Sequence, residues 1–370
     1  MFTDIIKEYN WEQTTNLIYS KTVDDVISAL QSKKPTIDDF MALISPAAEQ
    51  YIEQMAQKSS LITKKRFGKT IQLYVPLYLS NFCQNNCVYC GFSAKNSIKR
   101  KVLTFEEIEE EVIAIKKLGF QHILLVTGEA DVKAGAEYLA KAFEVIKKHM
   151  SSISIEVQPL KEEEYSSLIS SGLNTVYLYQ ETYNKQKYAN YHLKGNKANF
   201  ENRIDAYERL GRVGVYKIGL GFLAGLEDWR TDAFFTALHL NYLKKQYWKT
   251  KFSISFPRLR PHVGQFEPNS IMTDKHLAQL IFAYRLFDEN VEIALSTRES
   301  ASYRDNMISL GVTSMSAESR TDPGGYAHPE QNKELEQFTI NDNRTAAQMA
   351  ETIRSKGYEA VWKDWDFCLQ

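Results

Sequence analysis

The chain has 370 residues, of which 44% are hydrophobic and 25% charged, and its 45 basic and 46 acidic side chains leave a formal net charge of −1. This composition is that of a globular protein with a sizeable core, and the near-neutral balance argues against a nucleic-acid partner or an anionic membrane surface. The sequence contains no apolar run of about 18 residues and no apolar signal core at its N-terminus. We therefore expect a cytoplasmic protein that does not contact a membrane.

The first 68 residues are predicted to form a helical extension. Thr22 and Thr36 are each followed by two aspartates within three residues and then by apolar residues at helical spacing, as expected at the start of a helix. The stretch from Ala47 to Arg66 continues this helical pattern.

Beyond residue 70, short apolar runs rich in β-forming residues alternate with amphipathic helical runs. Eight of the apolar runs are predicted to be strands, over 71–77, 122–126, 153–157, 175–179, 216–221, 252–256, 292–295 and 312–315. Helices are predicted between them over 104–118, 133–150, 161–170, 199–213, 231–247 and 273–288. The first of these helices opens with Thr104 and Glu107 at capping-box spacing.

Eight strands that alternate with helices predict an α/β fold, specifically a parallel (β/α)8 TIM-type barrel. The alternative is an open doubly wound sheet, which usually has fewer strands and a nucleotide-binding loop after its first strand. Here cysteines follow the first strand instead. The predicted division is a helical extension over 1–68, the barrel over 69–320 and a short C-terminal extension over 321–370 that packs on the barrel.

Active sites of such barrels lie at the C-terminal ends of the strands. Polar residues follow most of the predicted strands, and these ends are therefore predicted to form a polar, ligand-binding mouth. The residues are Thr127–Glu129, Gln158, Gln180–Thr182, Arg258, Arg260, Ser296–Glu299, Ser316 and Glu318.

Three of the four cysteines, Cys83, Cys87 and Cys90, lie directly after the first strand with the spacing C-x3-C-x2-C. Thiolates bind zinc or iron–sulfur clusters, but structural zinc takes four protein ligands. The remaining Cys368 lies near the C-terminus, and no histidine occurs between Cys90 and His122. Three thiolates on a four-iron, four-sulfur (4Fe-4S) cluster leave one iron free to bind a cofactor. A cluster or zinc ion with only a structural or electron-carrying role is the alternative.

This cysteine spacing, with the aromatic Tyr89 before the third cysteine, resembles that of the radical S-adenosyl-L-methionine (SAM) superfamily. Further segments along essentially the whole chain resemble the 2-iminoacetate synthase family, the tyrosine lyases of thiamine biosynthesis. These segments are Tyr74–Asn81, Leu125–Glu129, Gln180–Tyr183, His192–Gly195, Ser255–Pro261, Leu295–Ser300 and Trp362–Asp366.

The resemblance implies a lyase that cleaves the Cα–Cβ bond of L-tyrosine to give 2-iminoacetate and 4-cresol, while SAM is consumed to 5′-deoxyadenosine and methionine. It also implies a thiazole synthase as partner and a low-potential electron donor such as flavodoxin. Two neighbouring radical SAM activities remain as alternatives, a tryptophan lyase and a deazaflavin-cofactor synthase. A non-catalytic iron–sulfur carrier or zinc-binding module is the alternative from another class.

The resemblance also implies roles for individual residues. Cys83, Cys87 and Cys90 would bind the cluster, and Tyr89 would lie beside the SAM adenine. Thr127, Gly128 and Glu129 would receive the SAM amino group, Glu181 the ribose hydroxyls and Arg203 the SAM carboxylate. Ser296 and Arg298 would bind the substrate carboxylate, for which the bidentate guanidinium is suited.

Some other residues invite interpretation without entering the predicted site. Gly219, Gly221 and Gly225 are interpreted as glycines that allow close approach near the adenosine, with no dinucleotide implied. His192 and His262 are expected to be structural, and Cys368 is expected to be a free thiol.

Overall fold

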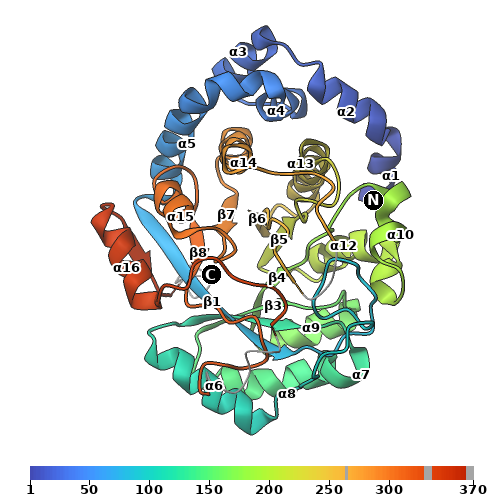
Figure 1. Ribbon diagram of the computed structural model, residues 1–370, viewed down its shortest axis with the longest axis vertical. Coiled ribbons are helices and arrows are strands. Elements are labelled where there is room, and N and C mark those ends of the chain that lie inside the picture. Colours follow the sequence, from blue (N-terminus) through green and yellow to red (C-terminus); the bar gives the residue numbers. More distant parts are fainter. Residues whose placement is uncertain (263–265, 329–335, 364–370) are drawn as a thin grey trace.

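The computed structural model describes residues 1–262, 266–328 and 336–363, and within them nine strands form one parallel sheet. Strands β1 to β8 follow one another around a ring, and β1 pairs with both β2 and β8, which closes the barrel (Figure 1). The predicted (β/α)8 barrel is therefore confirmed, and the open-sheet alternative is wrong.

The strand bounds lie close to those predicted. They are Thr70–Ser80 (β1), His122–Thr127 (β2), Ser152–Glu156 (β3), Leu173–Tyr177 (β4), Lys217–Gly221 (β5), Lys251–Ser255 (β6), Glu292–Leu295 (β7), Ser314–Ser316 (β8) and Glu359–Val361 (β9). The sequence did not predict β9, whose three residues are too few to show an alternating pattern. It pairs with the outer edge of β1 in register, from Thr70 opposite Glu359 to Gln72 opposite Val361.

Helices surround the barrel (Figure 1). They are α6 (Phe105–Lys117), α7 (Asp131–Ala134), α8 (Ala136–Ile146), α9 (Glu162–Ser170), α10 (Lys185–Tyr191), α11 (Phe200–Ile204), α12 (Ala206–Arg212), α13 (Trp229–Gln246), α14 (Asp274–Phe287) and α15 (Ala301–Met307). The helices predicted over 133–150 and 199–213 are each two shorter helices, divided at Gly135 and at Asp205. Helix α6 begins with the predicted capping box, in which the Thr104 and Glu107 side chains exchange hydrogen bonds with each other's backbone.

The N-terminal helices arch over the outer side of α13 and α14 (Figure 1). Predicted helix starts are confirmed at Thr22 and Thr36, each of which forms a capping box. Phe40 is buried and its ring lies 4.7 Å from that of Tyr284 on α14. The arch consists of α1 (Phe2–Ile5), α2 (Trp11–Tyr19), α3 (Val23–Gln31), α4 (Ile37–Ile44) and α5 (Ile52–Phe67).

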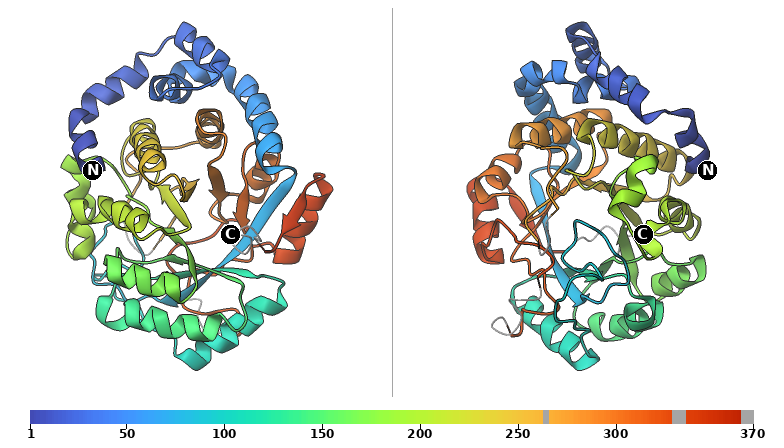
Figure 2. Two further views of the ribbon diagram at one scale, coloured as in Figure 1. Left: turned by 180° about the vertical axis from the view of Figure 1, so that it is seen from behind. Right: turned by 45° about the vertical axis from the view of Figure 1, so that its right-hand side comes forward.

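The C-terminal part adds α16 (Ala346–Ser355) and β9 to the outside of the barrel (Figure 2). Trp362 packs its ring against Phe120, with the ring centroids 5.3 Å apart. Of the segment Trp362–Asp366, residues 364–366 lie outside the described residues, as does Cys368. Helices thus precede the barrel and a short segment packs on it from the C-terminal side, as expected. The domain boundaries at residues 68 and 320 stay a prediction.

The interior of the barrel is closed by polar pairs at the N-terminal ends of the strands. Lys217 forms an ion pair of 2.7 Å with Glu292, and His122 lies 2.7 Å from the Ser154 hydroxyl. The opposite end, where the strands finish, is therefore the open one, as the sequence predicts for an active site of this fold.

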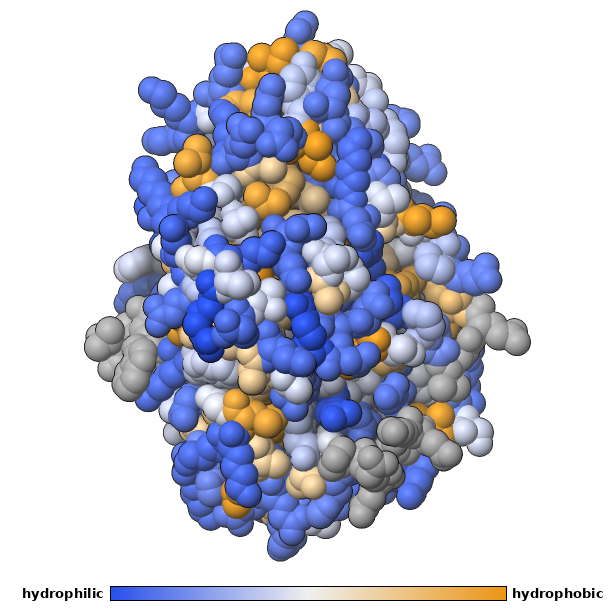
Figure 3. Space-filling model, turned by 60° about the vertical axis from the view of Figure 1, so that its left-hand side comes forward, coloured by the Kyte–Doolittle hydropathy of each residue, from blue (hydrophilic) through white to orange (hydrophobic). Residues whose placement is uncertain are grey.

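On the outer face shown in Figure 3, hydrophilic side chains dominate and hydrophobic ones are scattered between them. None of the helices in the described part of the chain is both long and apolar enough to span a membrane.

Candidate active site

A cavity of about 1500 Å³, measured out to its open mouth, lies at the C-terminal ends of the barrel strands. All eleven site residues predicted from the sequence line it, although they come from five separate segments of the chain. They are Cys83, Cys87, Tyr89, Cys90, Thr127, Gly128, Glu129, Glu181, Arg203, Ser296 and Arg298.

The loop that carries the cysteines is held by its own polar side chains. Arg100 donates to the carbonyl oxygens of Asn81, Phe92 and Ser93, at 2.7 Å in each case. The Asn81 side chain donates to the Lys99 carbonyl and accepts from the Lys101 amide. The loop is thus fixed from both sides, which holds the thiols in position without a disulfide.

The three thiols are free and all face the cavity. Burial raises the pKa of Cys83 and of Cys87, so these groups ionise only when a positive centre stabilises the thiolate. In the described part of the chain no three acidic, histidine or cysteine side chains converge as ligands of a single ion would. Three free cysteines that line one cavity fit a 4Fe-4S cluster instead, because each thiolate then binds a different iron.

Next to the thiols, four charged side chains, two buried and two partly buried, form an ion-pair network. The Arg203 guanidinium donates to Glu129 at 2.8 Å, and Lys197 donates to Glu181 at 2.6 Å. Arg203 also lies 3.7 Å from Glu181 and donates through Nε to the Tyr179 carbonyl at 2.7 Å. The network therefore places two carboxylates and two cations side by side at the ends of strands β2 and β4.

These charges hold one another ionised. Burial raises the pKa of Glu129, but Arg203 and Lys197 outweigh it and leave that pKa below its ordinary value. Burial and the neighbouring Arg203 disfavour the charge of Lys197, yet Glu181 and Cys87 outweigh them and raise its pKa. At neutral pH the network thus presents fixed charges of both signs to any ligand in this lobe.

Lys197 was missed by the sequence analysis. It lies in a short turn, Asn196–Ala198, with no motif of its own, and only the tertiary fold brings its ammonium to Glu181. Glu181 itself has a φ of +71°, a backbone conformation that residues other than glycine rarely adopt and that costs about 1–3 kcal/mol. Such strain at a charged residue in a cavity is typical of a functional position.

Tyr89 is fixed by a buried histidine. Its hydroxyl lies 2.7 Å from His192 Nε2, and His192 Nδ1 lies 2.9 Å from the Tyr188 carbonyl oxygen, to which it donates. Burial lowers the pKa of His192 to about 2, so the ring is neutral and its Nε2 accepts a hydrogen bond from the Tyr89 hydroxyl. This arrangement supports the structural role expected for His192.

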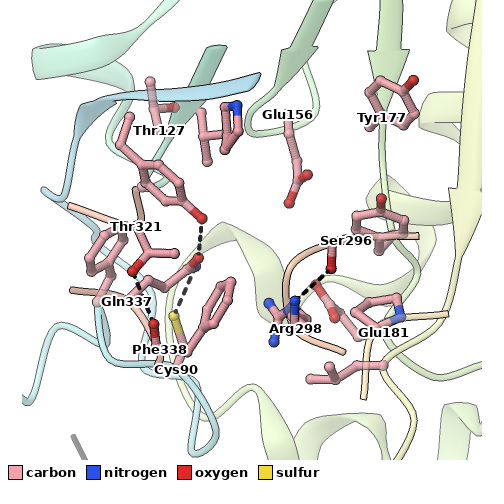
Figure 4. A pocket seen from close by; sticks show the side chains of 18 of the residues that line it. Cys90, Thr127, Glu156, Tyr177, Glu181, Ser296, Arg298, Thr321, Gln337 and Phe338 are labelled. Carbon is pink, nitrogen blue, oxygen red and sulfur yellow. Dashed lines mark hydrogen bonds between the residues drawn. The ribbon is translucent and has the colours of Figure 1, made fainter. Parts of the chain in front are cut away.

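Ser296 and Arg298 lie together on another wall of the cavity, after β7 (Figure 4). The Ser296 hydroxyl accepts from the Arg298 amide at 3.4 Å. The Arg298 guanidinium stacks on the Phe338 ring at 3.4 Å and donates to the Arg258 carbonyl at 3.4 Å. Stacking and one long hydrogen bond leave most of its donors available to an acidic ligand.

Two glycines expected near the adenosine have another role. A Cβ on Gly219 would lie 2.1 Å from the Tyr177 ring, and one on Gly221 would lie 2.1 Å from the Ser255 carbonyl oxygen and 2.7 Å from the Tyr179 ring. Neither glycine lines the cavity. They make room for the two tyrosines inside the barrel, so the structure does not support the predicted role near a ligand.

Gly128, by contrast, lines the cavity and supports the cysteine loop directly. A Cβ there would lie 2.2 Å from the Phe82 carbonyl oxygen and 3.2 Å from the Cys83 Cβ. The neighbouring Thr127 hydroxyl is buried and has no hydrogen-bond partner among the described residues. A buried donor without a partner at the edge of a cavity fits a site that is completed by a ligand.

Comparison with known proteins agrees with this geometry. Residues 77–236 match the model of the radical SAM superfamily, and residues 255–359 match the biotin and thiamin synthesis associated domain. The chain is 48% identical, over its full length and 97% of theirs, to the 2-iminoacetate synthases of Escherichia coli K12 and Salmonella typhimurium LT2.

Among solved structures, the FeFe-hydrogenase maturase HydG from Carboxydothermus hydrogenoformans is 30% identical and superposes with a TM-score of 0.89. That match covers 98% of this chain and 86% of the maturase. Full-length identity at this level, together with a cavity in which all the predicted site residues meet, shows that the chain belongs to the 2-iminoacetate synthase family of radical SAM enzymes.

Proposed function

We propose that this protein cleaves the Cα–Cβ bond of L-tyrosine to 2-iminoacetate and 4-cresol, and that it thereby supplies the thiazole moiety of thiamine. The observation that carries the proposal is the 48% identity to 2-iminoacetate synthases over the whole chain. The cavity, which joins the three thiols to a charged network and to Arg298, provides the surfaces that this reaction needs.

The enzyme uses a 4Fe-4S cluster and SAM, which when bound together supply the 5′-deoxyadenosyl radical that begins the reaction. Cys83, Cys87 and Cys90 would hold the cluster. Glu129 offers a carboxylate to the SAM amino group, and Arg203 offers a guanidinium to the SAM carboxylate. The two side chains already pair with each other, so they would present matched charges to the two ends of an amino acid.

Other residues of this lobe would complete the SAM site. Thr127 and Gly128 would line it beside Glu129, Glu181 would accept from the ribose hydroxyls, and Tyr89 would lie against the adenine. The fixed tyrosine ring and the strained Glu181 backbone favour a rigid site, which lowers the entropic cost of orienting the cofactor.

Ser296 and Arg298 would bind the carboxylate of L-tyrosine. This contact would orient the amino group toward the deoxyadenosyl carbon, and such orientation is the main contribution of a protein to radical chemistry. Burial of the Arg298 side chain in the barrel mouth strengthens its attraction for an acid, because water competes less there.

The chemistry of the product and of the cluster suggests two protein partners. An imine hydrolyses in water, so direct transfer to a thiazole synthase would protect it, and the cluster requires a low-potential electron donor such as flavodoxin. We propose that both are partners and that the enzyme works in the cytoplasm.

The test is anaerobic reconstitution with iron and sulfide, followed by SAM, dithionite and L-tyrosine. We expect 4-cresol and 5′-deoxyadenosine in equal amounts, with 2-iminoacetate or its hydrolysis product glyoxylate, and we expect Cys87→Ala to abolish all of them. Deoxyadenosine without 4-cresol would reject tyrosine as the substrate, and cleavage of L-tryptophan in its place would favour a tryptophan lyase.

A substitution at the substrate site adds a second readout. Arg298→Lys should raise the KM for tyrosine about tenfold or more, because a lysine loses the bidentate geometry, while the affinity for SAM stays unchanged. Arg354→Lys, on the exposed face of α16, is the matched control and should change neither value. Equal effects of the two substitutions would reject the proposed role of Arg298.

A further inference from the structure

One carboxylate in the cavity has no role in the site described so far. Three carboxylates line the cavity in the described part of the chain, and Glu129 and Glu181 are both paired with cations. The third, Glu156, is the last residue of β3, and no hydrogen bond or ion pair joins its carboxylate to a described residue. In Figure 4 the side chain points into the cavity, and no dashed line reaches it.

Polar groups around Glu156 are engaged elsewhere. The Tyr74 and Tyr179 hydroxyls, which the charge of Glu156 also affects, hydrogen-bond to Ser316 and Ser255. Arg298 stacks on Phe338 and does not come within ion-pair distance of the carboxylate. The Tyr78 hydroxyl donates to Gln337 at 2.8 Å. Burial raises the pKa of Glu156 to about 7, which shows how poorly its charge is compensated. A buried carboxyl group of this kind is costly unless a ligand supplies the hydrogen bond.

On the side of β1 and β2, the wall beside Glu156 is apolar. Val126 on β2 pairs in register with Glu156, and Leu124 lies two residues earlier on the same strand, with both side chains lining the cavity. Pro76 on β1, which is in register with Leu124, continues this wall. Such a surface, with one acceptor at its edge, matches a flat apolar ring that carries a single hydroxyl donor.

Glu156 and Arg298 lie on opposite sides of the barrel, so each can contact a different end of a bound amino acid. Strand β3 and strand β7 are four places apart in the ring of eight, so Glu156 and Arg298 enter the cavity from opposite walls. If Arg298 binds the substrate carboxylate, the amino group lies beside it on the same carbon. The far end of the side chain is then the part that reaches the wall of Glu156.

We propose that Glu156 accepts a hydrogen bond from the phenol hydroxyl of bound L-tyrosine and makes the enzyme select tyrosine over phenylalanine. This inference rests on the proposed function, since it assumes tyrosine as the substrate. A site built to bind a hydroxyl discriminates strongly against the analogue that lacks it, because the buried acceptor is then left unpaired.

The experiment compares three ligands on the reconstituted enzyme with SAM but without reductant, so that binding is measured without turnover. L-Tyrosine, L-phenylalanine and 3-(4-hydroxyphenyl)propionate are titrated anaerobically by calorimetry into the unsubstituted enzyme, Glu156→Met and Glu156→Gln. Asp322→Asn is the matched control, because Asp322 is another buried carboxyl group whose pKa burial raises, to about 6, but it does not line the cavity.

The unsubstituted enzyme should bind tyrosine about 10- to 100-fold more tightly than phenylalanine. Glu156→Met should reduce this preference to about threefold or less through weaker binding of tyrosine, and it should weaken the hydroxyphenylpropionate equally. Glu156→Gln keeps the size and one acceptor oxygen, so part of the preference should remain. Asp322→Asn should leave every ratio unchanged.

Two results would overturn the inference. Glu156 variants that keep the full preference would show that the hydroxyl binds elsewhere. Equal loss of tyrosine and phenylalanine, with unchanged binding of the deaminated acid, would assign Glu156 to the ammonium group instead. If the unsubstituted enzyme neither binds tyrosine nor releases 4-cresol, the proposed function itself fails, and that result is distinct from both.

Folding of the variants is a separate measurement. Glu156 has no partner among the described residues, so its replacement leaves no charge unpaired and should not lower the melting temperature. Glu156→Gln, which is isosteric, still decides between the outcomes if the methionine variant is unstable.

Discussion

The Arg203 guanidinium donates to the Glu129 carboxylate across 2.8 Å, although the two residues are 74 positions apart in the sequence. Arg203 is buried and Glu129 nearly so, and each is an ion that would be costly in the barrel mouth without the other. The pair therefore contributes to the stability of the protein as well as to its site, and the two contributions can be measured separately.

Removal of Arg203 should destabilise the protein even without SAM. Arg203→Ala leaves the Glu129 carboxylate buried without its guanidinium, and we expect the free energy of unfolding to fall by about 3–5 kcal/mol in a urea titration of the apoprotein. Arg212→Ala is the control, because it breaks an exposed pair with Glu162 and should cost about 0–1 kcal/mol. Similar small losses for both variants would show that the buried pair is no stronger than a surface one.

Gly128→Ala should prevent assembly of the cluster. The new methyl group would lie 2.2 Å from the Phe82 carbonyl oxygen, so the backbone next to Cys83 must move. We expect reconstituted protein with less than half of the normal iron content and visible absorbance. Gly357→Ala, which meets no atom within 4 Å but has a φ of +76°, should cost roughly 1 kcal/mol in stability and leave the iron content intact.

Gln337 should tune the cluster. Its side-chain amide donates to Cys90 Sγ at 3.6 Å, and hydrogen bonds to ligand sulfur stabilise the more negative, reduced cluster. Gln337→Leu should therefore lower the reduction potential, as followed by electron paramagnetic resonance during a redox titration. Gln348→Leu, at the exposed start of α16, is the control. An unchanged or higher potential in Gln337→Leu would contradict the expected effect.

His239 should make the protein sensitive to acid. The ring stacks on Phe2, with the centroids 3.9 Å apart, and burial lowers its pKa to about 3. Because the unfolded chain binds a proton near pH 6.5 and the folded chain does not, this residue lowers the free energy of unfolding as the pH falls below 6.5. The loss approaches about 1.4 kcal/mol per pH unit and ends near pH 3.

His239→Gln should remove that dependence. It keeps a neutral partner for the Tyr183 hydroxyl, which lies 2.9 Å from His239 Nδ1. The difference in unfolding free energy between the two proteins, measured in urea from pH 7 to pH 4, should change by about 1.4 kcal/mol per unit in the acid part of the range. A difference that does not vary with pH would show that His239 has the same pKa in the folded and the unfolded protein.

Much of the fold and part of the site could be predicted, because both depend on short stretches of sequence. The C-x3-C-x2-C spacing and the polar residues after most strands are local features, and the barrel brings the cysteines and many of these polar residues to one mouth. Gln158, Gln180, Thr182, Arg258, Glu299 and Glu318 do not line the cavity. Lys197, Glu156 and Gln337 could not be found in this way. Lys197 lies in a turn without a motif, and in the sequence Glu156 cannot be told from any other polar residue of a strand. Gln337 lies more than 200 residues after Cys90.

Strand β9 was missed for a related reason, and it has a consequence for how the protein is made. Strand β1, which leads directly into the cysteine loop, is completed on one edge by residues 359–361. Residues 359–361 must therefore be synthesised before the strand that supports the cysteines has all its neighbours. Before that point β1 lacks one of its neighbours, so we expect the cluster to be inserted after residues 359–361 have paired with β1.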